Sequence, residues 1–167
     1  LETGFEPFLH PNLYCDFDES SASTRRAREL VAGADSQGAA LRAICDFIAR
    51  NIKYDTAKAE KLANGSGYIP NPDATLSAGS GICFDYASLG AAMLRSVGIP
   101  AQIITGYVSP DDFYHAWIMV YIDGTWHTIQ ISVDPNTWSR VDLTLAATDG
   151  GNAYVGDGIS YQDRYVY

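Results

Sequence analysis

The chain has 167 residues, of which 47% are hydrophobic, so it is long enough to bury a substantial core and is most simply interpreted as one domain over 1–167. Its formal net charge of -9 is concentrated beyond residue 61, where three Lys or Arg accompany ten Asp or Glu. Nucleic acids and anionic membrane surfaces both need a basic footprint, so this composition argues against them and favours a cationic or neutral substrate. No apolar run reaches the roughly 20 residues that span a bilayer.

The first 20 residues have no regular hydrophobic period, which predicts an extended arm packed on the domain by its apolar side chains: Phe5, Phe8, Leu13 and Tyr14. A Ser and Thr cluster then supplies N-caps for a first helix over about 24–32, which Gly33 ends. From Ser36 to Ile52, apolar residues recur every three or four positions, which predicts an amphipathic second helix.

The segment 56–81 is rich in Gly, Ala, Asn, Ser and Pro, which predicts a long loop that leads to Cys83. Cys83 begins a further helix, whose apolar stripe continues to Val97 and which Gly98 ends. The free amides and the positive dipole end of a helix N-terminus favour a thiolate over a thiol. Cys83 is therefore the leading candidate for a nucleophile, and Asp85 is interpreted as an acid that complements the dipole.

An apolar strand is predicted over 101–108 and a second strand over 115–122. Asp123-Gly124 is typical of a two-residue hairpin turn, which predicts a third strand over 125–133. Helices first and antiparallel strands afterwards indicate an α+β fold, with the Cys83 helix central and packed on the sheet. We expect a core over about 36–138, followed by a C-terminal packing segment, 139–167, with a short helix or strand near its start.

The three cysteines, Cys15, Cys45 and Cys83, form no CxxC pair, so a zinc site is not expected, and the residues require no metal or organic cofactor. Cys15 and Cys45 either form a disulfide, which suits an extracellular protein, or remain two buried thiols. The chain begins without Met, which suggests a processed form. We expect an extracellular or cell-surface location, and a cytoplasmic one stays open.

A thiol nucleophile needs a base, usually His, and a third polar group that orients the imidazole. His10 lies in the arm and His127 lies inside the predicted third strand, whereas His115 begins the second strand beside an acidic turn. In the predicted hairpin, Gln130 and Asp134 lie on the same face as His115. Either side chain is a candidate to orient it.

The stretch from Gly81 to Ala101, GICFDYASLGAAMLRSVGIPA, is followed by Gly106-Tyr107, by His115-Ala116-Trp117 and by Asp123-Gly124-Thr125-Trp126. Together these blocks resemble the transglutaminase-like superfamily of papain-type cysteine enzymes. The preceding Ile52-Lys53-Tyr54-Asp55 matches the Tyr-Asp pair with which the family ends a helix before its Cys loop. The resemblance covers roughly 40–138 and implies a Cys-His-Asp triad, with Cys83 as nucleophile and His115 as general base and then acid.

The third member of the triad departs from the family pattern. The family places its catalytic Asp four residues after a Trp, but Gln130 stands four residues after Trp126, and an Asp-Pro pair follows only at Asp134. We favour Asp134, brought into place by a bulge, because a carboxylate stabilises imidazolium better than a neutral amide; Gln130 is the alternative. The backbone amide of Cys83 and the hydroxyl of Tyr54 are candidates to stabilise an oxyanion.

Two functions follow as expectations. The favoured one is thiol-dependent cleavage of amide bonds in peptides or proteins through a thioester, with release to water preferred over transfer to an amine, since the resemblance is to small single-domain bacterial-type members. The alternative is a domain with a weakened triad that binds a peptide or a cell-wall polymer, which the Gln130 substitution motivates. The oligomeric state stays open.

Overall fold

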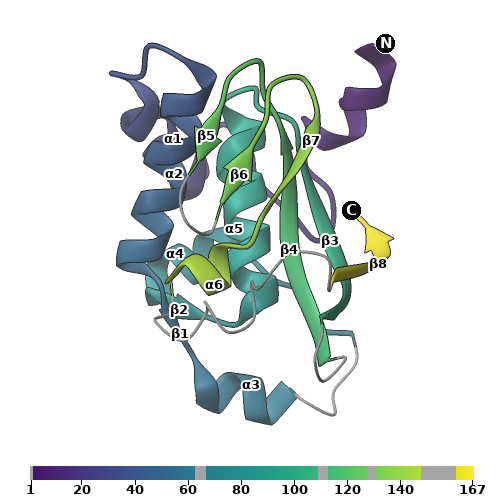
Figure 1. Cartoon of the computed structure of the whole chain (residues 1–167). Helices are drawn as coiled ribbons and strands as arrows, with labels where there is room; N and C mark the ends of the chain where they lie inside the picture. Colours follow the sequence, from purple (N-terminus) through teal and green to yellow (C-terminus); the bar gives the residue numbers. More distant parts are fainter. Residues whose placement is uncertain (1, 63–66, 109–112, 128–130, 148–160) are drawn as a thin grey trace.

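The computed structural model describes residues 2–62, 67–108, 113–127, 131–147 and 161–167. The fold has the mixed helical and sheet composition that the sequence predicts, with the helices mostly first (Figure 1). Its helices are η1 (Glu2–Phe8), α1 (Ala22–Val31), α2 (Gln37–Asn51), α3 (Thr56–Leu62), α4 (Pro72–Ala78), α5 (Cys83–Ser96) and α6 (Leu143–Ala147). Within these residues, no helix is both long and apolar enough to cross a membrane.

In the described part of the chain the strands form three separate sheets, of which the largest runs in the order β7-β4-β3-β8 with every neighbouring pair antiparallel. The other two are a parallel pair, β1 with β2, and an antiparallel pair, β5 with β6. The strand bounds are β1 (Lys53–Tyr54), β2 (Ser80–Gly81), β3 (Ala101–Val108), β4 (Phe113–Tyr121), β5 (Trp126–His127), β6 (Ser132–Val133), β7 (Trp138–Val141) and β8 (Tyr161–Val166).

Helix α5 is the centre of the domain, as predicted. It contacts α1, α2 and α4 on its helical side and β3 and β4 on its other side. Its run of small residues permits this close packing: a Cβ added to Gly90 would lie 2.4 Å from a methyl carbon of Leu143 in α6. All of the residues from Asp85 to Arg95 are buried. The start of α5, where Cys83 lies, is therefore held from several sides.

The predicted hairpin at Asp123-Gly124 is wrong. Strand β4 pairs with β7, with Ile118 opposite Val141, instead of with the segment directly after the turn. The turn and β5 both contact α2, where the backbone N–H of Asp123 donates to Gln37 Oε1 at 2.8 Å. This tertiary contact prevails over the local turn preference of Asp-Gly, and the predicted third strand becomes the short β5 and β6 pair.

The predicted loop over 56–81 is also wrong in part, because it contains two short helices. Asn71 caps α4 by accepting the backbone N–H of Ala74 at 3.0 Å, and Pro72 takes the first helical position, where its missing N–H costs nothing. Gly79 ends α4 with a φ of 67°, a left-handed conformation that Gly adopts without strain. The cap and stop signals for α4 were present in the sequence.

The N-terminal arm packs on the domain as predicted, but it is not extended throughout, because Glu2–Phe8 form the 3-10 helix η1. The ring of Phe5 lies 4.6 Å from that of Tyr121, and the ring of Phe8 lies 5.5 Å from that of Trp138. Leu13, in contrast, is 61% exposed and does not anchor the arm. Cys15 and Cys45 are free and buried, so the structure favours two buried thiols over a disulfide.

Candidate active site

Cys83 is the first residue of α5, where the sequence predicts it, and it is half-buried. The chain reaches it through β2, which pairs in parallel with β1 and aligns Tyr54 with Gly81. The backbone N–H of Asp55 donates to Gly81 O at 2.9 Å. These backbone hydrogen bonds hold the turn that precedes Cys83 and so determine where its side chain lies.

His115 lies on β4, beyond the last residue that pairs with β7, and only 4% of its surface is exposed. Its Nε2 atom lies 2.7 Å from Asp142 Oδ2. The Cys83 side chain is close enough to the ring to raise the pKa of His115, and Nδ1 is the ring nitrogen that Asp142 leaves available to it. The Trp117 ring stacks beside the imidazole, with ring centroids 6.2 Å apart. The imidazole thus joins a thiol to a carboxylate.

Asp142 reaches His115 because of the β4–β7 register. Val141 pairs with Ile118, so the next residue, Asp142, comes beside Trp117, which is on the same strand face as His115. Asp142 is 7% exposed and stands between the end of β7 and the start of α6. A buried carboxylate of this kind needs a charged or hydrogen-bonding partner, and His115 provides one.

The environment of His115 favours the imidazolium ion. Burial by itself lowers the pKa of His115, but the charge of Asp142, the hydrogen bond to it, and the hydrogen bond and charge of Cys83 together raise the pKa to about 10. His115 is then protonated at neutral pH. A protonated imidazole beside a thiol at a helix N-terminus favours the thiolate form.

This raised pKa predicts a pH-dependent stability. The contribution is complete below the unfolded pKa, about 6.5, and is lost as pH rises through the folded value, about 10. The free energy of unfolding should fall by a few kcal/mol across that window in urea denaturation at matched pH values. Asp142→Asn should lose this part of the slope, while His10→Gln, on an exposed residue, should keep it. Equal slopes for wild type and Asp142→Asn would contradict the paired imidazolium.

Tyr54 pairs with Gly81, two residues before Cys83, and is 40% exposed. Burial, and then the negative charge of Cys83, raise the pKa of Tyr54. The phenol therefore keeps its proton at neutral pH and can donate a hydrogen bond. The neighbouring backbone N–H of Ile82 is used elsewhere, because it donates to Asp85 Oδ2 at 2.9 Å.

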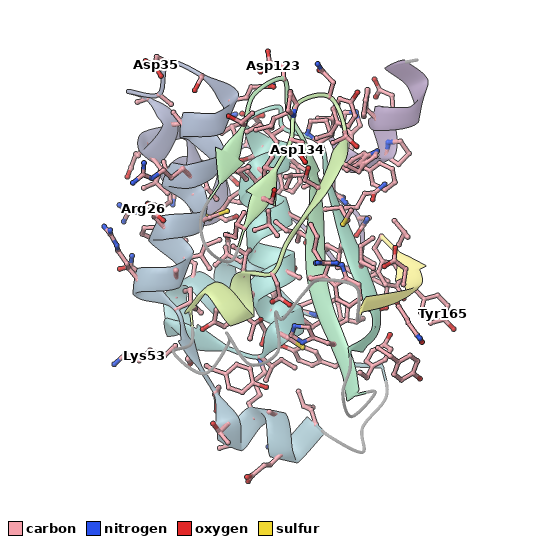
Figure 2. All side chains as sticks on the ribbon, viewed as in Figure 1. Arg26, Asp35, Lys53, Asp123, Asp134 and Tyr165 are labelled. Atoms are coloured by element: carbon pink, nitrogen blue, oxygen red, sulfur yellow. The ribbon has the colours of Figure 1, made fainter. Side chains whose placement is uncertain are left out.

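Asp134, the favoured third member, is not brought to His115. Its backbone N–H contacts Ser139 Oγ at 3.1 Å, and Ser139 pairs with Val120. This part of β4 is about five residues from His115, or roughly 17 Å along an extended strand. Figure 2 shows Asp134 near Asp123, which follows the end of β4. Asp142 therefore replaces Asp134 as the candidate third group.

The alternative third residue, Gln130, lies outside the described residues. His10 lies at the end of the arm, where its Nε2 contacts Glu6 Oε2 at 2.9 Å, and takes no part in the site. Sequence reasoning missed Asp142. A signal did exist: Asp142 directly precedes a short helical segment, but only the β7 register connects it with His115. Among the described residues, no group of three or more His, Cys, Asp or Glu is placed to hold a metal ion.

Comparisons with known proteins concern the family and the fold. The family model of the transglutaminase-like superfamily matches residues 24–143. A UPF0252 protein of Methanocaldococcus jannaschii is 29% identical over 136 residues, which cover 72% of this chain and 38% of that protein. Human kyphoscoliosis peptidase is 29% identical over 108 residues, which cover 59% of this chain and 15% of the peptidase. The chain thus spans well under half the length of these relatives.

A solved structure supports the fold. A Cytophaga hutchinsonii protein provisionally assigned as a cysteine protease aligns with a TM-score of 0.60 and 24% identity, covering 89% of this chain and 50% of that one. At this identity the likeness concerns the fold. The family match, in contrast, extends over more than half of the sequence and includes Cys83, His115 and Asp142. This chain belongs to the transglutaminase-like superfamily.

Proposed function

We propose that this chain hydrolyses amide bonds in peptides or proteins through a thioester on Cys83. In this proposal Cys83 is the nucleophile, His115 is the general acid and base, and Asp142 orients the imidazole. The observation that carries the proposal is the position of the His115 ring, which is hydrogen-bonded to Asp142 at 2.7 Å and lies close enough to the Cys83 side chain for that side chain to raise the pKa of His115. Acyl transfer requires a nucleophile, a base beside it and a carboxylate that orients the base, and these three groups are arranged here in that order.

The reaction begins when the Cys83 thiolate attacks the substrate carbonyl carbon and forms a C–S bond. The carbonyl oxygen becomes an oxyanion, which the backbone N–H of Cys83 and the hydroxyl of Tyr54 are candidates to stabilise. Imidazolium His115 then gives its proton to the leaving amine as the C–N bond breaks, which leaves a thioester and a neutral imidazole.

The second half of the reaction reverses the proton transfer. Neutral His115 removes a proton from the incoming water, whose oxygen attacks the thioester carbon. The C–S bond then breaks, the carboxylic acid product leaves, and Cys83 returns as a thiolate beside imidazolium His115. The Asp142 carboxylate compensates the imidazolium charge, and its hydrogen bond to Nε2 keeps Nδ1 directed at sulfur. If an amine enters in place of water, the same steps give a transamidated product.

Family membership supports an activity of the cysteine-protease or transglutaminase type. The name of the human relative, a peptidase, favours peptide or protein substrates. The second candidate, a binding module with a weakened triad, was motivated by a neutral amide in the third position. The buried Asp142 carboxylate on His115 favours the enzyme over that module.

The test uses one protein substrate and two possible acceptors of the acyl group, water and an added amine. The chain is incubated with unfolded casein, with and without a dansylated alkyl amine, and mass spectrometry counts new peptide termini and dansyl adducts. We expect new termini in both samples and a hydroxylamine-sensitive thioester on Cys83 after rapid acid quenching. Dansyl adducts without new termini would show that the chain transfers the acyl group to an amine and does not hydrolyse the amide bond. The absence of new termini, adducts and thioester would contradict the enzymatic proposal.

A further inference from the structure

Asp85, two residues after the nucleophile, is a fully buried carboxylate with 0% exposure. Its Oδ2 atom accepts the backbone N–H of Ile82 at 2.9 Å and the Lys58 ammonium at 2.7 Å. Its Oδ1 atom accepts the hydroxyl of Tyr68. Asp85 is therefore far more than an acid that complements the helix dipole, because two segments distant in sequence converge on it.

The Asp85 side chain presses against the turn that delivers Cys83. A Cβ added to Gly81 would lie 2.6 Å from Asp85 Cβ and 2.9 Å from Oδ2, so only Gly fits there. Because Asp85 also holds the N–H of Ile82, it fixes both residues that precede Cys83. The carboxylate is thus placed to control the geometry and the charge around the thiol.

Lys58 is the cation of this cluster. It belongs to α3, in which no residue from Thr56 to Leu62 is buried. Figure 1 shows α3 extending away from the main body. Its side chain nevertheless reaches the buried Asp85 and also lies 2.6 Å from the hydroxyl of Tyr68. Burial by itself lowers the pKa of Lys58, but the hydrogen bonds to Asp85 and Tyr68 raise it, so the ammonium persists at neutral pH.

The charge of Asp85 is unfavourable for the proposed chemistry. Cys83 and Asp85 lie in one helical turn, so their charges are within about 10 Å of each other, and a lone buried carboxylate there would oppose a thiolate. Among the residues that the structure describes, the other titratable groups around the thiol are His115 on β4, its partner Asp142, and Tyr54 on β1. Lys58 is the group that cancels the Asp85 charge by direct contact.

We propose that Lys58 is a positioning residue that acts through Asp85, holding the turn before Cys83 and cancelling the carboxylate charge that would otherwise suppress its thiolate. This inference rests on the proposed function, since it concerns the same nucleophile. It assigns a role in the active site to α3, a helix that contributes no residue to the Cys83, His115 and Asp142 group.

The experiment measures the rate of iodoacetamide alkylation against pH, which needs no substrate. Cys15 and Cys45 are buried, and Cys83→Ala gives the background. Lys58→Met should move the midpoint of the profile up by about one pH unit, which slows alkylation about 10-fold at pH values below the wild-type midpoint. Lys58→Arg should restore the wild-type profile. Tyr68→Phe is the matched control, because it removes one hydrogen bond of Asp85 and keeps the Lys58 ion pair.

Two further variants separate charge from packing. Asp85→Asn leaves the Lys58 charge uncancelled and should move the midpoint down, opposite to Lys58→Met. This variant has no unpaired carboxylate, so it tests the proposal even if Lys58→Met fails to fold. The double variant Lys58→Met with Asp85→Asn should return close to the wild-type midpoint.

The outcomes distinguish this inference from the proposed function. A wild-type Cys83 that alkylates no faster than the cysteines of the urea-unfolded chain would contradict the proposed function itself. A reactive wild-type thiol with an unchanged midpoint in Lys58→Met, or with no downward shift in Asp85→Asn, would overturn the role of Lys58 alone. A double variant as slow as Lys58→Met would mean that packing, and not charge, is what Lys58 supplies.

Discussion

Replacing Cys83 by Ala is expected to abolish turnover and iodoacetamide labelling together. Ala has no atom that can form the thioester, so amide cleavage should fall to background, a loss that we expect to exceed 10⁵-fold in kcat. Cys83 is half-buried at the start of α5, and the helix core begins only with the residues that follow it. The melting temperature should therefore change by only a few degrees.

Cys45→Ala is the matched control for this variant. Cys45 is a buried thiol on α2 and is not one of the Cys83, His115 and Asp142 group. Its burial raises the pKa of the thiol well above the ordinary value, so it should not react. Cys45→Ala should keep the activity and lose some stability. Activity retained in Cys83→Ala would contradict the assignment of the nucleophile.

Replacing Asp142 by Asn is expected to reduce kcat roughly 10³- to 10⁴-fold at neutral pH. The amide keeps the size of the carboxylate but cannot compensate an imidazolium, and it can bind the wrong His115 tautomer. Since the 2.7 Å contact to Nε2 is the one that holds Nδ1 toward Cys83, the loss should appear in kcat more than in KM. Steady-state kinetics on a peptide that the wild type cleaves provides the measurement.

Asp134→Asn is the control that decides between the two aspartates. Asp134 was the favoured third group from the sequence, but it lies near the Val120 end of β4. Its replacement should leave kcat within about twofold of wild type. A large loss in Asp134→Asn with little change in Asp142→Asn would restore the sequence-based assignment. Circular dichroism of both variants shows whether a lower rate reflects unfolding.

Most of the secondary structure that positions the nucleophile was predictable. The amphipathic period from Ser36, the helix that begins at Cys83 and the strand over 101–108 all appear at the expected positions. These signals are local: side-chain periodicity, a capping residue and a β-branched run each act over one element. Ser36 accepts the N–H of Ala39, which shows such a local cap in place.

The errors concern segments whose structure depends on distant partners. Asp123-Gly124 has the composition of a hairpin turn, yet Ile122 leaves the sheet, and Ile122 O accepts the N–H of Asn136. The prediction of the third triad member depended on the strand pairing assumed after this turn, because a strand register determines which side chains share a face. The wrong pairing therefore led to the wrong residue. Replacing that pairing by β4 with β7 exchanges Asp134 for Asp142.

The sequence by itself determined the family and the α+β order, and it singled out Cys83 and His115 as candidates, because one helix-start cysteine and one strand histidine are visible in local patterns. The tertiary structure alone decided which carboxylate meets His115 and which cation meets Asp85. Both are contacts between residues separated by 27 positions along the chain, at 2.7 Å in each case. No local propensity encodes such pairs, since they depend on strand register and on the docking of α3.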